Sequence, residues 1–310
     1  MTPKRIGVVG PGAVGILLGV FLARSGEEVV FLDHSPDRVQ RLQGRTFCVE
    51  TSEGVLEQRV PVVRLCQCQE GGALLILATK NHSLEAAISN LPSAKEWEVV
   101  LVVQNGLGVE QKVRPYCRPG ALLRAVLHLG ASLQAEGHVR LAGLGPVVLD
   151  ASHPRVGWVC QLLQQAGLEA RPTTSIEKSV WQKALLNSAI NPLTAILQVP
   201  NGVLLEHAST KWLLEKLLQE GARVAQKQGV DIQLQRLIEM AERILRKTAS
   251  NRSSMLQDIL RRRPTEVESL NGQMVRLARQ SSLSVPAQET ILHLVQALEE
   301  TKEKRCLSKS

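Results

Sequence analysis

The stretch "RIGVVGPGAVGILLGVFLARSGEEVVFLD", residues 5–33, decides the fold of the N-terminal half of the chain. It predicts a strand over 5–9, a glycine-rich turn, a helix that ends near Gly26 and a second strand over 28–32. A G-x-G-x-x-G pattern is informative when it follows a strand and opens a helix, and this one does both. The stretch therefore predicts a Rossmann dinucleotide-binding domain.

Each glycine of this turn has an expected role. Gly10 allows a tight turn, Gly12 lets the backbone approach a pyrophosphate, and Gly15 lets the helix pack closely on the strand. The phosphates are expected at the N-terminus of the helix, where backbone N–H groups and the helix dipole favour anions. The predicted cofactor-binding residues of the turn are Gly10, Pro11, Gly12, Ala13, Val14 and Gly15.

Asp33, at the end of the second strand, bears on the choice between NAD and NADP. An acidic side chain there accepts hydrogen bonds from the ribose 2′-hydroxyl and repels a 2′-phosphate, which favours NAD. His34, Arg38 and Arg41 follow directly, and any of them could reach a 2′-phosphate if Asp33 turns away. The local sequence leaves both cofactors open.

Two further apolar runs predict strands of the same parallel sheet. They are "ALLILATKNHS", residues 73–83, and "EVVLVVQNGLGVE", residues 98–110. Ligands of such sheets bind beyond the carboxyl ends of the strands, so Lys80 and Asn105 are candidates for contacts with cofactor or substrate. The later run over 122–150 predicts antiparallel edge strands that complete this sheet.

From about Ser175 onward the strand patterns stop and helical periodicity takes over. The dipeptide Asn191-Pro192 is expected to end or kink the first helix. We therefore expect an α/β protein with a Rossmann domain over 1–173 and an all-helical substrate-binding and catalytic domain over 174–310. The predicted helices span 176–190, 209–229, 231–248, 265–280 and 286–303.

The first predicted helix carries Lys183, Asn187 and Asn191 at a spacing of four residues. At 3.6 residues per turn these positions drift by only about 40° per step, so they share one face. Apolar residues occupy most of the remaining circumference, which predicts a buried helix. Buried ammonium and amide groups need partners. Either neighbouring backbone satisfies these three groups, or they form the polar wall of a small-molecule cleft.

The segment "NRSSMLQDILRRRPTEVESLNG", residues 251–272, has two readings. Its first polar residues could cap a helix that starts near Met255, and Thr265 could cap one that begins at Glu266, where an acid favours the helix dipole. Alternatively, these residues belong to the active site. The first polar residues in question are Asn251, Ser253 and Ser254.

A nicotinamide cofactor delivers a hydride, and the protein must then supply one proton to the developing alkoxide of a carbonyl substrate. A lysine oriented by a carboxylate can do this. Lys183 with Glu266 fits that requirement.

Composition excludes several classes of function. Aromatic residues make up 3% of the 310 residues, which argues against a protein that stacks nucleic-acid bases. The net charge of +8 suits a small anionic substrate or cofactor phosphates equally well. Residues 6–23 are uncharged but too rich in glycine for a membrane helix, and no hydrolase or metal motif occurs. Six cysteines without a C-x-x-C pair indicate reduced thiols in a cytoplasmic protein.

These residues together resemble the ketopantoate reductase (2-dehydropantoate 2-reductase) family. The resemblance follows the family order along nearly the whole chain, and the middle and late motifs are specific. The matching motifs are the glycine-rich turn at 10–15, "TK" at 79–80, "QNGLG" at 104–108, "WQKALLNSAINPLTAI" at 181–196, "PNG" at 200–202, the segment 251–272 and "VP" at 285–286.

The resemblance implies a fold like that of 6-phosphogluconate dehydrogenase and a role for each matching residue. Lys183 is implied as the proton donor, Glu266 as the carboxylate beside nicotinamide and lysine, and Lys80 as a cofactor contact. Asn105 is implied to bridge cofactor and substrate. The implied substrate-binding residues are Asn105, Asn187, Asn191, Asn201, Asn251, Ser253 and Ser254.

The implied reaction is the NADPH-dependent reduction of 2-dehydropantoate to (R)-pantoate, in pantothenate and coenzyme A biosynthesis. Many family members have a basic residue where this chain has Asp33, so NADH stays an alternative. Two other readings also stay open: a reductase of another small 2-oxo or β-keto acid, and a non-catalytic NADPH-binding sensor. A homodimer is compatible with the resemblance, whereas a metal, a membrane and a nucleic-acid partner are not expected.

Overall fold

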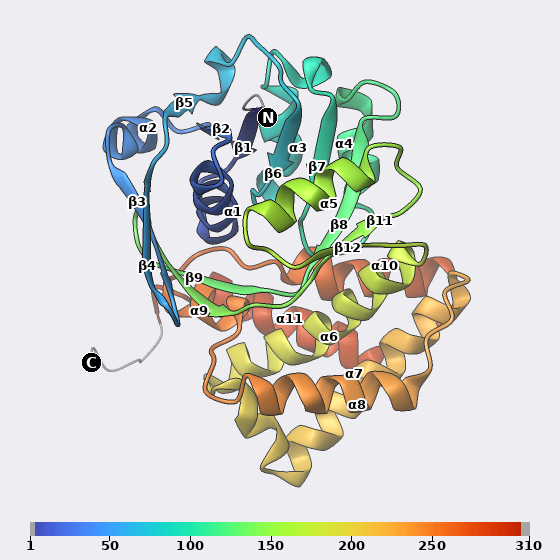
Figure 1. Ribbon diagram of the computed structural model, residues 1–310. Helices are drawn as coiled ribbons and strands as arrows, with labels where there is room; N and C mark the ends of the chain where they lie inside the picture. The colour runs from blue at the N-terminus through green and yellow to red at the C-terminus, as the bar shows by residue number, and fades with distance from the viewer. Residues whose placement is uncertain (1–3, 305–310) are drawn as a thin grey trace. The chain divides into compact units, whose positions relative to one another are not determined.

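The computed structural model describes residues 4–304, and their contacts divide the chain into two compact units. The first unit contains the described residues up to Gln104 together with Gly108–Ile176. The second contains Asn105–Leu107 and the described residues from Glu177 onward. The order of the elements along the chain can be followed by colour in Figure 1.

The first unit is built on an eight-stranded sheet with the order β12-β11-β8-β7-β6-β1-β2-β5. Its strands from β5 to β8 in this order are all parallel, and β11 runs antiparallel to β8. The strands predicted at 5–9 and 28–32 and in the runs 73–83 and 98–110 are confirmed. The strands are β1 (Arg5–Val9), β2 (Glu28–Asp33), β5 (Val62–Arg64), β6 (Leu74–Leu77), β7 (Val99–Val102), β8 (Leu122–Leu127), β11 (Val147–Asp150) and β12 (Ala170–Thr173).

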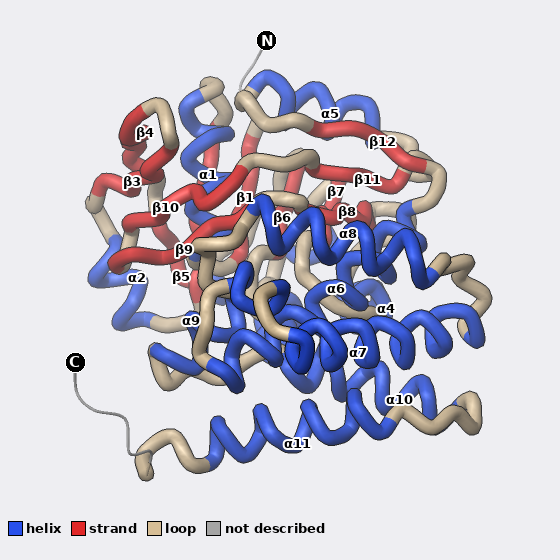
Figure 2. Tube along the Cα trace, turned by 90° about the horizontal axis from the view of Figure 1, so that it is seen from below, coloured by secondary structure: helices blue, strands red, loops and turns tan. Residues whose placement is uncertain are grey.

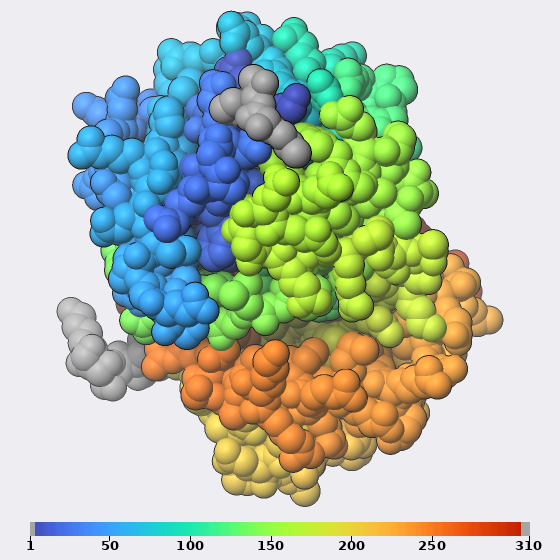
Figure 3. All heavy atoms as spheres, in the orientation of Figure 1, coloured from blue at the N-terminus to red at the C-terminus, as the bar shows by residue number. Residues whose placement is uncertain are grey.

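Helices cover both faces of this sheet, as its continuous apolar strands require. In β6, Leu74 and Ile76 join one apolar core with α1 and α5, while Leu75 and Leu77 join another with α3 and α4. The face that carries α1 (dark blue) and α5 (yellow-green) is visible in Figure 3. The helices are α1 (Ala13–Arg24), α2 (Pro36–Leu42), α3 (Asn81–Ser89), α4 (Val109–Val113) and α5 (Val156–Gln165), with short 3₁₀ turns at Leu65–Gln67, Ala94–Glu96 and Arg114–Tyr116.

A second sheet of four strands, in the order β4-β3-β10-β9, packs against α1 (Figure 2). The prediction that all of 122–150 completes the main sheet is therefore wrong in part, because only β8 and β11 join it. The reason is the residue pattern: in β9 and β10 every second residue packs on the apolar core, namely Ala131, Leu133, Val139 and Leu141, which suits a sheet with one covered face. The strands are β3 (Thr46–Thr51), β4 (Gly54–Arg59), β9 (Gly130–Ala135) and β10 (His138–Gly143).

In its described residues the second unit is helical, as predicted. Its helices enclose one apolar core. A Cβ on Gly221 in α7 would lie 2.4 Å from Leu185 Cδ2 in α6, so glycine is what allows these two helices to pack closely. The elements are α6 (Ile176–Leu197), the 3₁₀ helix η4 (Asn201–Leu205), α7 (Ala208–Lys227), α8 (Leu234–Lys247), α9 (Ser254–Leu260), a π-helix (Glu268–Gly272) that continues into α10 (Gln273–Gln280), and α11 (Pro286–Glu300).

The first of these helices does not end at Asn191-Pro192. It runs on to Leu197 with Pro192 inside it, so the predicted end is wrong. Proline has no N–H, and the carbonyl of Ser188, four residues earlier, therefore lacks its helical donor. The Asn271 side chain donates to that carbonyl instead, at 2.8 Å. A residue distant in the sequence thus satisfies the carbonyl that proline leaves without a donor.

Three further findings concern the described residues only. Five of the six cysteines are free, and the sixth, Cys306, lies outside the described part of the chain. Within residues 4–304, no helix combines the length and the hydrophobicity that a membrane span needs. The same residues contain no group of three or more histidine, cysteine or acidic side chains placed to hold a metal ion.

Candidate active site

Two glycines of the turn after β1 are required by the chain itself. Gly10 has a φ of +88°, in the left-handed region that favours glycine. A Cβ on Gly15 would lie 2.1 Å from the carbonyl oxygen of Gly10, so the start of α1 packs against the turn only without a side chain. Both residues behave as the sequence pattern predicts.

Gly12 differs from these two glycines. A Cβ there would meet no described atom within 4 Å, and its φ of −89° is open to any residue. Nothing in the described chain therefore requires glycine at this position. A bound pyrophosphate would require it, because phosphate oxygens could then approach the backbone N–H groups at the start of α1. The turn thus fits a dinucleotide.

The Asp33 carboxylate at the end of β2 is turned inward. Its side chain is 1% exposed and accepts a hydrogen bond from Ser35 N at 2.8 Å. The guanidinium of Arg38 lies 3.2 Å from the same carboxylate and also donates to the carbonyl of Pro11 at 2.6 Å. The pair joins the end of β2 to the glycine-rich turn, and its opposite charges largely cancel.

The other basic residues after β2 differ in how they are held. Arg41 makes two hydrogen bonds to Glu136, of 2.9 and 3.0 Å. The hydrogen bond between Arg41 and Glu136 lowers the pKa of Glu136 and raises the pKa of Arg41. Both groups are therefore charged at neutral pH, and Glu136 matches the charge of Arg41. The imidazole of His34 is exposed beside Asp33.

The ends of β6 and β7 are joined by Gln104, which the sequence did not single out as a site residue. Its amide donates to the carbonyls of Leu77 and Thr79, at 2.8 and 3.2 Å. These bonds hold together the strand ends that precede Lys80 and Asn105. The only feature of the sequence that points to Gln104 as a site residue is its position in the "QNGLG" motif.

The three residues after Gln104 belong to the second unit by their contacts, although strands of the first unit lie on both sides of them in the sequence. Leu107 packs against the apolar core of the helices. Asn105 is therefore part of the same unit as Lys183 and Glu266.

The predicted stripe on α6 is where this helix reaches the surface of its unit. Between Trp181 and Ala195 every residue is buried except Gln182, Lys183 and Asn187. Asn191 continues the stripe and is 8% exposed. The buried remainder of α6 confirms the predicted enclosure of the helix, and the stripe is left as its accessible polar face.

The structure brings the end of this stripe to the start of α9. Asn191 Nδ2 lies 3.5 Å from Ser254 Oγ, and the hydroxyls of Thr194 and Ser253 lie 2.7 Å apart. Ser253 also caps α9 by accepting from Leu256 N at 3.1 Å. The capping alternative therefore holds for Ser253, whereas Ser254 is exposed beside Asn191.

Asn201 and Asn251 lie together as well. Asn201 N donates to the carbonyl of Asn251, and its side-chain amide donates to Thr248 Oγ1, both at 2.9 Å. The Oδ1 atom of Asn201 is buried and has no hydrogen-bond partner within the described chain. An acceptor without a donor suits a hydroxyl-bearing ligand.

The helix predicted over 265–280 begins at Val267, so Glu266 directly precedes it. The hydroxyl of Thr265 accepts from Val267 N at 3.2 Å, so it satisfies one backbone N–H at the start of this helix. Thr265 N itself donates to Glu299 Oε1 at 2.6 Å, and Ser269 Oγ donates to the Glu266 carbonyl at 3.0 Å. Both ends of the Thr265–Glu266 segment are thus fixed by hydrogen bonds, and the π-helix follows directly.

Known proteins resemble the chain along nearly its full length. The family model described as "Ketopantoate reductase PanE/ApbA" matches residues 6–153, and "Ketopantoate reductase PanE/ApbA C terminal" matches 175–299. A 2-dehydropantoate 2-reductase of Halobacterium salinarum is 32% identical, with 94% of this chain and 97% of that protein covered. The chain belongs to the ketopantoate reductase family. The resemblance inferred from the motifs is confirmed.

Two solved structures are similar to this ketopantoate reductase family member. D-mandelate dehydrogenase with NADH and anilino(oxo)acetate has a TM-score of 0.91 at 25% identity, covering 96% of this chain and 99% of that one. A PanE/ApbA family ketopantoate reductase from Ralstonia eutropha JMP134 has a TM-score of 0.88 at 26% identity, with the same coverage. Both share the fold over nearly the whole chain, and membership of this oxidoreductase family indicates a nicotinamide cofactor.

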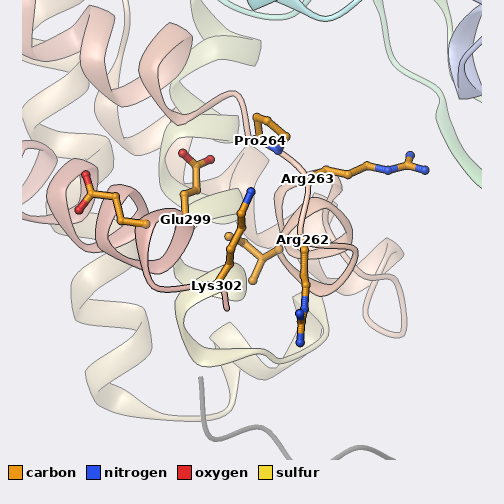
Figure 4. A pocket seen from close by; sticks show the side chains of 7 residues that line it. Arg262, Arg263, Pro264, Glu299 and Lys302 are labelled. Carbon is orange, nitrogen blue, oxygen red and sulfur yellow. The ribbon is translucent and has the colours of Figure 1, made fainter. Parts of the chain in front are cut away.

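A cavity of about 250 Å³ in the helical unit does not coincide with these residues (Figure 4). Arg262 and Arg263 at its rim point in different directions, so they do not converge on one anion. None of the predicted site residues lines it. The lining residues are Ile259, Arg262, Arg263, Pro264, Glu299, Glu300 and Lys302.

Proposed function

We propose that this chain catalyses the NADPH-dependent reduction of 2-dehydropantoate to (R)-pantoate, a step of pantothenate and coenzyme A biosynthesis. The observation that carries the proposal is the accessible polar stripe of α6, with Lys183 and Asn187 as two of the three residues between 181 and 195 that are not buried. The full-length similarity to a 2-dehydropantoate 2-reductase supports it.

Bound NADPH would supply the hydride. Backbone N–H groups at the start of α1, from Gly12 onward, would hold its pyrophosphate. Lys80, after β6, contributes a positive charge to cofactor binding, and Gln104 holds the strand ends beside it.

Lys183 donates the proton to the alkoxide oxygen as the hydride arrives at the carbonyl carbon, and Glu266 orients its ammonium. The amides hold the carboxylate and hydroxyl groups of the substrate, and Asn105 contacts both substrate and cofactor. The residues proposed to bind substrate are Asn105, Asn187, Asn191, Asn201, Asn251, Ser253 and Ser254.

Initial rates of reduced-nicotinamide oxidation on adding ketopantoate test the proposal. Turnover with ketopantoate at a kcat/KM at least about tenfold above that for other 2-oxo acids is expected. A second candidate, reduction of another 2-oxo acid, is favoured by the similarity to D-mandelate dehydrogenase, whose structure contains anilino(oxo)acetate. An aromatic 2-oxo acid therefore belongs in the substrate panel. Cofactor binding without oxidation for any ketoacid would indicate a nucleotide sensor.

The preference for NADPH rests on the inward Asp33–Arg38 pair, which leaves no unpaired carboxylate to repel a 2′-phosphate. Replacing Arg38 by alanine is expected to lower the ratio of kcat/KM for NADPH to that for NADH by at least about tenfold. The variant loses the charge-assisted bond between Arg38 and Asp33, and the Asp33 carboxylate, without its guanidinium partner, would then repel the 2′-phosphate of NADPH. Arg41→Ala is the control, because it leaves the Asp33–Arg38 pair intact and Glu136 keeps Arg38 as a basic neighbour at 3.7 Å, so the ratio should stay nearly unchanged. A wild-type protein that prefers NADH contradicts the assignment.

Two expectations remain: a cytoplasmic location, which rests on the cysteine pattern, and a homodimer, which is compatible with the family resemblance. Analytical ultracentrifugation of the purified chain tests the second. A species of about twice the chain mass of 33.9 kDa is the expected result.

A further inference from the structure

Pro192 leaves a gap in the hydrogen-bond ladder of α6, inside the part of the helix that carries the polar stripe. The carbonyl it deprives of a donor belongs to Ser188, which lies directly after Asn187 and is completely buried. A buried carbonyl without a partner costs about 1–3 kcal/mol, so this position needs a replacement donor.

Asn271 supplies that donor. It is completely buried, and its Nδ2 donates to the Ser188 carbonyl and to Gln288 Oε1, each at 2.8 Å. The orientation of both amides is determined, because Gln288 Nε2 donates to the Leu217 carbonyl at 2.9 Å and its Oε1 must then accept. Asn271 therefore uses both N–H bonds of one amide to join α6 to α11.

The far side of this bridge is fixed by a buried carboxylate. Glu220 in α7 is 1% exposed and accepts from Ala287 N at 3.2 Å and from Gln288 N at 3.0 Å, at the start of α11. A negative charge is favourable at a helix N-terminus. Gln288 is thus held through its backbone and its side chain, and its Oε1 is a fixed acceptor for the Asn271 amide.

Asn271 lies in the π-helix, five residues after Glu266. π-helical turns are rare and occur often at functional sites. This one places the Asn271 amide against the proline gap of α6, between Asn187 and Asn191. A single side chain therefore connects the helix that bears Lys183 with the helical segment that follows directly after Glu266.

We infer that Asn271 is a positioning residue of the reductase reaction: it replaces the hydrogen bond that Pro192 cannot make, and so sets the α6 stripe in register with Glu266. The inference rests on the proposed function, in which Lys183 and Glu266 act together. Asn271 itself contacts helix backbone and Gln288 and is not assigned a contact with substrate.

A double-substitution experiment tests this assignment. Asn271→Ala is expected to lower kcat by roughly 10- to 100-fold, since displacements near 1 Å in an active site have effects of that size, with little change in the Kd of the cofactor. In Pro192→Ala the helix regains a backbone N–H for the Ser188 carbonyl. The double variant Pro192→Ala/Asn271→Ala is therefore expected to recover kcat to within about threefold of Pro192→Ala.

Gln288→Ala is the matched control, since it removes the other acceptor of the same amide and leaves the bond to Ser188. It is expected to lower the Tm about as much as Asn271→Ala but to lower kcat clearly less, because the Ser188 carbonyl keeps its donor. If Asn271→Ala does not fold, Asn271→Leu takes its place, because leucine has a similar volume and no hydrogen-bond donor for Ser188.

A double variant as slow as the Asn271 variant overturns the inference, and so does an Asn271 variant with full turnover. These outcomes differ from failure of the proposed function, in which the unsubstituted protein itself oxidises no nicotinamide with any ketoacid. That last result overturns both proposals together.

Discussion

Replacing Lys183 by alanine is expected to lower kcat by roughly 10²- to 10⁴-fold, the usual contribution of a general acid. The ammonium is proposed to deliver the proton that the alkoxide needs, and water is a poorly positioned substitute. The Kd of the reduced nicotinamide should change little, because the proposed pyrophosphate site is the turn after β1. Steady-state kinetics with ketopantoate and a cofactor titration measure the two effects separately.

Lys178→Ala provides the control on the same helix. Lys178 lies near the start of α6, is 40% exposed and pairs with Asp231 at 3.2 Å. Its removal subtracts the same charge without touching the stripe, so kcat should stay within about twofold of the wild-type value. A Lys183 variant that turns over as fast as the Lys178 variant removes Lys183 from the mechanism.

Replacing Gly12 by alanine is expected to weaken nicotinamide dinucleotide binding by roughly 10- to 100-fold. The loss of one hydrogen bond to a charged phosphate costs about 1.5–3 kcal/mol, which corresponds to that factor. The fold should tolerate the side chain, because no described atom lies within 4 Å of a Cβ at this position. Calorimetric titration and a thermal melt of the same sample give the two quantities.

Gly15→Ala, in the same turn, is expected to destabilise the fold itself. Its Cβ would lie 2.1 Å from a backbone oxygen, which cannot move aside without shifting the turn. A loss of about 1–3 kcal/mol in the free energy of unfolding is expected, as for other overpacked positions. If the Gly12 variant melts as early as the Gly15 variant, Gly12 is a structural glycine and its assignment to the cofactor is wrong.

The parts of the fold that follow from local chemistry were predictable from the sequence. The strand over Arg5–Val9 has the predicted bounds, because an apolar run and a glycine turn determine it within a few residues. The start of α6 at Ile176 was likewise readable from helical periodicity. The candidate residues of α6 were accessible to prediction for the same reason, since a spacing of four places them on one face.

What the sequence did not reveal depends on residues that meet across long separations. The strands β3 and β4 were not anticipated, and β10 was assigned to the wrong sheet, because pairing between Thr46–Thr51 and His138–Gly143 has no local signature. The continuation of α6 through Pro192 depends on an amide 79 positions later, at Asn271. Propensity alone correctly marks proline as a helix breaker, and only the tertiary partner overrides it.

The membership of Asn105–Leu107 in the helical unit has a consequence for dissecting this protein. The chain passes from one unit to the other at three places: after Gln104, after Leu107 and after Ile176. A fragment cut near residue 174 would keep Leu107 but lose the apolar core on which it packs. The helical half expressed alone would lack Asn105–Leu107, and therefore the Leu107 side chain that packs on its apolar core. Adding residues 105–107 as a separate peptide, or joining them to the helical half by circular permutation, would restore this contact.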